Sequence, residues 1–86
     1  MPINIYSEDS KVAWLCDDNW RLPDQSDALE KWLIQNHSTL KPGRYVADIG
    51  FSPREDALGG GTSFSPETLR IMADLGMSLF LSEYPN

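Results

Sequence analysis

Two side chains in this sequence are of the types required for nucleophilic catalysis. Cys16 is the only cysteine and His37 the only histidine, so they could pair as nucleophile and general base. Nothing in their spacing orients such a pair, and a cysteine at the end of a strand usually behaves as a small hydrophobic residue. We therefore expect no catalytic residues and no enzymatic activity. A small hydrolase that uses Cys16 is the less favoured alternative.

The glycine run at residues 59–61 suggests a phosphate-binding loop, because it precedes a predicted helix and helix N-termini bind anions. However, no lysine follows the glycines, Pro66 removes one backbone donor, and Glu67 places negative charge where a phosphate would lie. The pattern therefore favours a connecting loop. One histidine, one cysteine and scattered acids give no metal-ligand pattern either, so we expect no metal and no cofactor.

An acidic segment around a tryptophan is the most informative polar feature of the sequence. Five carboxylates lie within fourteen residues, interrupted only by Arg21, and they surround Trp20. Carboxylates accelerate the encounter with a basic surface, and a large aromatic side chain supplies buried area. The expected partner-binding residues are Asp17, Asp18, Trp20, Asp24, Asp27 and Glu30. The alternative is a capped helix with a solvated acidic face.

Composition and charge restrict the class of partner. The 86 residues fit one domain, 1–86, with a formal net charge of -6. This charge disfavours nucleic acids and anionic membranes, which are polyanions, and favours a protein with a basic surface. A single cysteine excludes an intramolecular disulfide. The sequence shows no signal-peptide pattern and no apolar run of about 18 residues, so we expect a cytoplasmic protein.

Alternating apolar residues predict a β-hairpin at the start of the chain. Its strands are expected at residues 3–6 and 11–16, with a turn at residues 7–10. Val12 and Trp14 should share one face of the second strand. A short extension of the sheet could follow at residues 20–22, before Pro23.

The first helix is expected over residues 24–40, before a stop at Pro42 and Gly43. Asp24 is the expected N-cap, and Ser26 is the competing one. The apolar stripe of this helix comprises Leu29, Trp32, Leu33 and Leu40.

The second half of the chain has the clearest start and stop signals. A central strand is expected over residues 44–51, followed by a long loop over residues 52–64. Ser65 is the expected N-cap of the second helix, and Gly76 its left-handed C-terminal residue. The last strand is expected over residues 77–82. The buried stripe of the second helix is expected to comprise Leu69, Met72, Ala73 and Gly76, with Leu75 beside it.

The order of elements predicts an α+β fold, a two-layer sandwich. Because strand–helix–strand crossovers are nearly always right-handed, both helices should cover one face of a mixed sheet of about four strands. The other face would carry Trp14 or Ala13, together with Val46 and Phe80, and nothing in the chain covers it. Asp48 should be a solvent-facing carboxylate on that face. A partly apolar open face predicts a partner or a homodimer.

A set of structural motifs links the chain to a known family. They lie at residues 14–15, 29–33, 59–61, 64–69, 73–76 and 78–84. Through them, the chain resembles, over residues 14–85, a bacterial domain family of unknown function. Its members are small stand-alone proteins, often similar to immunity proteins of bacterial toxin systems. By the same resemblance, a first strand–helix unit of longer relatives is expected to be missing here, which strengthens the expectation of a partner. The resemblance implies no catalytic residues.

These observations predict a non-enzymatic acidic binding protein. The resemblance implies an immunity-type inhibitor that masks the active or basic surface of a cognate bacterial toxin. The alternative is a self-associating structural or accessory domain that dimerises through its open sheet face.

Overall fold

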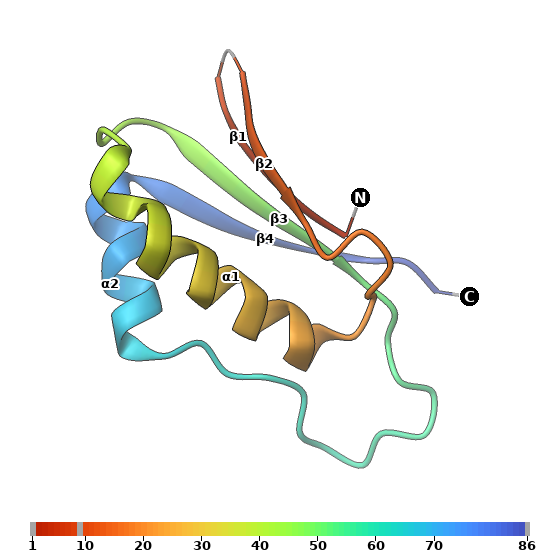
Figure 1. The fold of residues 1–86 in the computed structure, drawn as a ribbon. Helices are drawn as coiled ribbons and strands as arrows, with labels where there is room; N and C mark the ends of the chain where they lie inside the picture. Colours follow the sequence, from red (N-terminus) through yellow and green to blue (C-terminus); the bar gives the residue numbers. More distant parts are fainter. Residues whose placement is uncertain (1, 9, 86) are drawn as a thin grey trace.

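A four-stranded sheet with two helices on one face forms the framework of the computed structural model (Figure 1). The structure describes residues 2–8 and 10–85. Its elements in chain order are β1 (Ile3–Ser7), β2 (Lys11–Leu15), α1 (Leu22–Asn36), the short 3-10 helix η1 (His37–Thr39), β3 (Tyr45–Phe51), α2 (Pro66–Leu75) and β4 (Met77–Glu83). This architecture confirms the predicted α+β fold with two helices over a mixed sheet.

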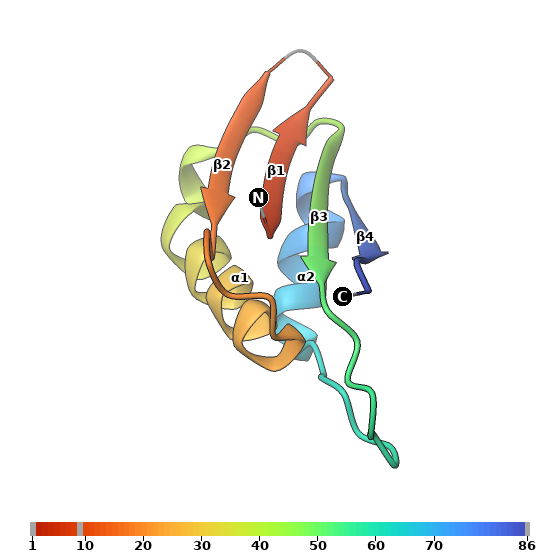
Figure 2. The same cartoon turned by 90° about the vertical axis from the view of Figure 1, so that its right-hand side faces the viewer.

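The strand order is β2-β1-β3-β4. β1 pairs antiparallel with both β2 and β3, whereas β3 and β4 pair in parallel. The connection through α1 therefore crosses over β1, and the connection through α2 joins two neighbouring strands. Both helices lie on the same face, and Figure 2 shows the opposite face of the sheet with no helix in front of it.

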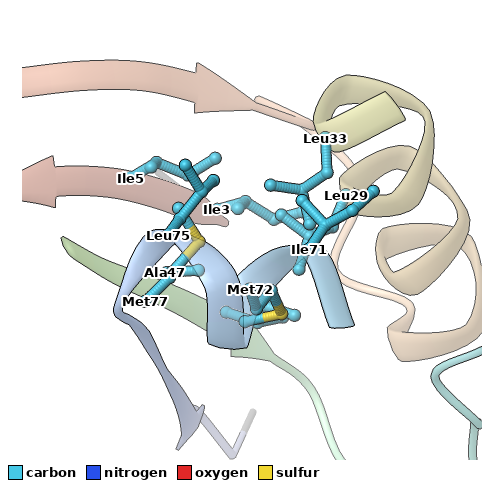
Figure 3. Close-up of a cluster of buried hydrophobic side chains, with 10 residues drawn as sticks. Ile3, Ile5, Leu29, Leu33, Ala47, Ile71, Met72, Leu75 and Met77 are labelled. Carbon is cyan, nitrogen blue, oxygen red and sulfur yellow. The ribbon is translucent and has the colours of Figure 1, made fainter. Parts of the chain in front are cut away.

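The hydrophobic core lies between the sheet and the two helices (Figure 3). Ile3, Ile5 and Ile49 are fully buried on the two central strands. Leu29 and Leu33 of α1 meet them from the other layer. Fully burying an aliphatic side chain of this size contributes roughly 1.5–3 kcal/mol, so this layer is the main source of stability.

The first helix begins earlier than the sequence predicts, at Leu22. Arg21 is its N-cap and makes no side-chain capping bond, so neither Asp24 nor Ser26 caps the helix. Pro23 lies in the first turn, where a missing N–H has no intrahelical partner to lose. Consequently residues 20–22 do not extend the sheet. The α-helix also ends earlier, at Asn36, and continues only as η1.

A β-bulge in the first hairpin shows that the prediction of a shared face for Val12 and Trp14 is wrong. Ile5 pairs with Ala13 and Tyr6 pairs with Lys11, so Val12 is the extra residue on β2. Val12 therefore packs against the core instead of sharing a face with Trp14. Because of the same extra residue, Lys11 and Trp14 come to one face. The turn at residues 7–10 includes Asp9, which lies outside the described residues.

The second helix confirms its predicted ends and corrects its predicted stripe. The Ser65 hydroxyl accepts a hydrogen bond from the Thr68 N–H at 3.1 Å, and Gly76 is left-handed with φ 75°. The buried residues are Thr68, Ile71, Met72 and Leu75, whereas Leu69 and Ala73 are exposed. The buried stripe starts one residue earlier than predicted, at Thr68. This polar residue can be buried because its hydroxyl donates a hydrogen bond to Glu30 of α1.

We expect Gly76→Ala to lower the free energy of unfolding by about 2 kcal/mol or more. A Cβ at Gly76 would lie 2.1 Å from the carbonyl oxygen of Gly43, and left-handed backbone costs a non-glycine residue roughly 1–2 kcal/mol. Urea denaturation measures the change. Gly43→Ala is the matched control, because its Cβ would meet the Tyr45 ring at an ordinary 3.6 Å. Equal losses in the two variants would contradict this account.

Candidate functional site

The connection between β2 and α1, residues 16–21, forms a tight acidic turn. Cys16 has a left-handed backbone with φ 57°, and its carbonyl accepts a hydrogen bond from the Asn19 N–H at 3.2 Å. Asp17 and Asp18 lie at the tip of this turn, and both are exposed. The turn therefore presents two adjacent carboxylates to solvent at one end of the sheet.

A buried amide side chain fixes the acidic turn to the sheet. The Gln25 Nε2 group donates to the carbonyl of Asn19 at 2.8 Å and to the carbonyl of Gly50 at 2.7 Å. Gln25 is fully buried beneath this connection. A third link comes from the Ser52 N–H, which donates to the Trp20 carbonyl at 3.0 Å. Because these bonds join α1, the turn and the end of β3, the acidic turn has a defined position.

Trp20 is held by an aromatic contact over a glycine. Its ring packs edge-on against Tyr84, with 5.6 Å between the centroids and 76° between the planes. A Cβ on Gly50 would lie 2.8 Å from the Tyr84 ring and 3.4 Å from the Trp20 ring, so a side chain at this position would push the Tyr84 ring out of this contact. Trp20 nevertheless remains 37% exposed. It is an aromatic side chain fixed in place with a face available for contact.

The structure separates the six predicted partner-binding residues into two groups. Asp17, Asp18, Trp20 and Asp24 gather around the acidic turn, where Asp24 pairs weakly with Arg21 at 4.0 Å. The other two acids, one and two turns further along α1, point elsewhere. Asp27 lines an open hollow of about 540 Å³ together with Gly60 and Gly61. Glu30 accepts hydrogen bonds from Ser65 and Thr68.

Glu30 therefore already has a role within the fold. Its carboxylate oxygen links α1 to the first turn of α2, and the distance from the Thr68 Oγ1 atom is 2.6 Å. Hydrogen bonds from the Ser65 hydroxyl, and then from the Thr68 hydroxyl, hold the pKa of Glu30 below its usual range. Their effect is larger than that of partial burial, which raises this pKa. A partner that contacts Glu30 has to share it with these two hydroxyls.

Cys16 and His37 do not form a catalytic pair. Cys16 precedes the N-terminus of α1, whereas His37 follows its C-terminus. A helix of 15 residues spans about 22 Å, so the two side chains cannot share a proton directly. Burial, and then the charges of Asp24 and Asp17, raise the pKa of the Cys16 thiol. The thiol is therefore neutral at physiological pH, and the neutral form is the weaker nucleophile.

The uncovered sheet face forms a second surface with a polar centre. One row of paired residues crosses all four strands: Trp14 of β2, Asn4 of β1, Asp48 of β3 and Phe80 of β4. The aromatic residues at its ends are 48% and 53% exposed. Asp48 is half-buried and accepts a hydrogen bond from the Ser82 hydroxyl at 2.7 Å. It faces away from the helices, as predicted, and its strand lies inside the sheet.

Two absences hold for residues 2–8 and 10–85. Within them, no group of three or more histidine, cysteine, aspartate or glutamate side chains is placed to hold a metal ion. Over the same residues, no helix has the length and apolar character needed to cross a membrane.

Comparison with known proteins gives no relatives. The chain matches no protein-family model, no curated protein and no solved structure. The resemblance to immunity-like bacterial proteins therefore stays a prediction.

Three residues that shape this surface were not singled out from the sequence. Gln25, Gly50 and Tyr84 position the acidic turn and Trp20. Each acts through a residue more than twenty positions away, so no local pattern marks it. The only available signal was the glycine inside a strand pattern, which often indicates a close approach by another group.

We expect Glu30→Gln to reduce the dependence of stability on pH. A depressed carboxyl pKa stabilises the folded state above the ordinary glutamate pKa of about 4.3, and this contribution disappears as pH falls through the lower folded-state pKa. Wild type should therefore be the more stable protein near neutral pH, and the two curves should converge once the pH falls below the lowered folded-state pKa of Glu30. Urea denaturation across this range measures both.

The control for this experiment is Glu55→Gln, an exposed loop residue with no side-chain hydrogen bond among the described residues. It should keep the wild-type pH profile. A Glu30→Gln curve parallel to that of wild type at every pH would contradict the proposed contribution of the carboxylate.

Proposed function

We propose that this chain is a non-enzymatic acidic binding protein, an immunity-type inhibitor that covers the active or basic surface of a cognate bacterial toxin. The observation that carries the proposal is the placement of Trp20 next to the exposed carboxylates of the acidic turn. Asp17 and Asp18 are exposed there, and Trp20 is fixed by Tyr84 while keeping part of its ring accessible. The proposal takes its toxin-system context from the sequence resemblance.

Physical arguments support binding through this surface. A net charge of -6 attracts a basic partner, and carboxylates at the rim raise its rate of association. Buried tryptophans are among the residues that contribute most to interface energies. Binding also costs less entropy when the contact residues are already ordered. The Gln25 and Tyr84 contacts provide such order for the acidic turn and for Trp20.

A non-enzymatic role is further supported by the positions of Cys16, the candidate nucleophile, and His37, the candidate general base. Cys16 has a raised pKa, and His37 lies at the far end of α1. The hydrolase alternative based on Cys16 therefore lacks its expected histidine base beside the thiol.

The test uses the product of the gene next to that of this chain as the candidate toxin. We expect Asp17→Lys/Asp18→Lys to weaken binding at least tenfold at low salt, because attraction becomes repulsion, and the difference should shrink as salt screens the charges. Trp20→Ala should weaken binding at all salt concentrations. Isothermal titration calorimetry measures each affinity, and growth rescue measures inhibition.

Glu67→Lys/Asp74→Lys is the matched control, since it changes the net charge equally on the exposed surface of α2. It should retain most of the affinity. Equal losses of affinity in both double variants would rule out the acidic turn as the binding site. A neighbouring gene product that is harmless, or that does not bind, would remove support for the toxin-inhibitor function itself.

Self-association is the second candidate function, and the uncovered sheet face favours it. Trp14 and Phe80 are each about half exposed at the two ends of the same row. Two copies could bury these aromatic side chains against each other, as large exposed apolar patches usually mark an interface.

Analytical ultracentrifugation distinguishes the two candidates. The self-association function predicts a stable dimer that dissociates in Phe80→Glu, because a buried unpaired charge is costly. The inhibitor function predicts a monomer for wild type and variant alike. A monomer at micromolar concentrations would contradict dimerisation through the sheet face.

A further inference from the structure

A small pocket opens on the uncovered face of the sheet. Its volume is about 290 Å³, and its lining includes Asn4, Asp48, Trp14 and Tyr84. Drug-sized ligands occupy pockets of roughly 300–1,000 Å³, so this one suits a single long side chain better than a complete cofactor. It adjoins the acidic turn, because Tyr84 packs on Trp20.

Besides the Lys11 ammonium, the pocket is lined by two side chains, Asn4 and Asp48, that carry acceptor oxygens. Asp48 Oδ1 accepts from Ser82, and no second hydrogen bond or ion pair to this carboxylate occurs among the described residues. The Oδ1 atom of Asn4, next to Asp48 on the neighbouring strand, is buried and has no hydrogen-bond partner within residues 2–8 and 10–85. An unpartnered buried acceptor costs free energy that an incoming donor would recover.

The pocket wall already attracts a cation from its own chain. The Lys11 ammonium lies 3.3 Å from the centroid of the Trp14 ring, which is a cation–π contact. The bulge at Val12 makes this possible by directing Lys11 to the open face. Lys11 forms no ion pair with Asp48. It therefore occupies the aromatic wall, and the Asp48 carboxylate has no ion-pair partner among the described residues.

We propose that this pocket receives an arginine side chain of the protein partner, which displaces Lys11 from Trp14. A guanidinium group has five donors and no acceptor, and its plane stacks on aromatic rings. It can donate to the Asp48 carboxylate and to Asn4 Oδ1 while its face rests on Trp14. The inference deepens the proposed function, because it names one group through which a basic partner is recognised.

The test needs no partner protein. Blocked arginine (N-acetyl-arginine N-methylamide) is titrated into the ¹⁵N-labelled chain, with blocked citrulline as the neutral control of the same shape. Arginine should shift the Trp14 indole and Asn4 side-chain signals, with a Kd on the order of millimolar for so small a ligand. Citrulline should leave these signals unchanged. Equal shifts with the two compounds would overturn the proposal.

Two variants with opposite expected effects sharpen the test. Asp48→Asn keeps the acceptor for Ser82 and should weaken arginine binding about tenfold, because charge-assisted hydrogen bonds are the stronger ones. Lys11→Met removes the competing ammonium and should strengthen binding about threefold, a gain that lost folding cannot imitate. Asp74→Asn, on the exposed surface of α2, should change little. An unchanged affinity in both Asp48→Asn and Lys11→Met would refute the pocket.

The arginine titration and the binding test of the neighbouring gene product can fail independently. If arginine does not bind while Asp17→Lys/Asp18→Lys still loses the toxin-like partner, the pocket inference fails and the inhibitor function stands. If arginine binds at Asp48 while the neighbouring gene product does not bind, the pocket stands and the inhibitor function fails.

Discussion

Burial of one sheet face against two helices is the interaction on which the rest of the structure depends. Ile3 and Ile5 of β1 and Ile49 of β3 direct their side chains into this layer. Since side chains alternate along a strand, the residues between them must point the other way, including Asn4 and Asp48. Two helices cover a single face of four strands, so the uncovered face and its polar centre follow from the way the core is built.

A few polar contacts extend this order beyond the strands. The Gln25 amide joins the acidic turn to the end of β3 through the carbonyls of Asn19 and Gly50. The same glycine provides the space in which Trp20 and Tyr84 meet. The acidic turn and the uncovered face are thus neighbouring parts of one surface, because both are fixed to the same end of the sheet.

The sequence predicts structure well where a residue acts on near neighbours. Ser65 and Gly76 are correctly assigned because capping bonds and left-handed backbone are local properties. Pro23 is ambiguous, since it fits both the end of a strand and the first turn of a helix. The bulge at Val12 and the contacts of Gln25 depend on segments distant in sequence, so local patterns cannot reveal them. The acids of the site were therefore predictable as residues, whereas their grouping was not.

The two outer strands of the sheet differ in how well their free backbone groups are protected. β2 carries Lys11 and a bulge, and both features discourage the addition of another strand. β4 has a single charged residue, Glu83 at its end, and the side chains of Phe80 and Leu81 are about half exposed. Another polypeptide can therefore extend the sheet more readily along β4 than along β2, and the backbone of β4 would set the direction of the added strand.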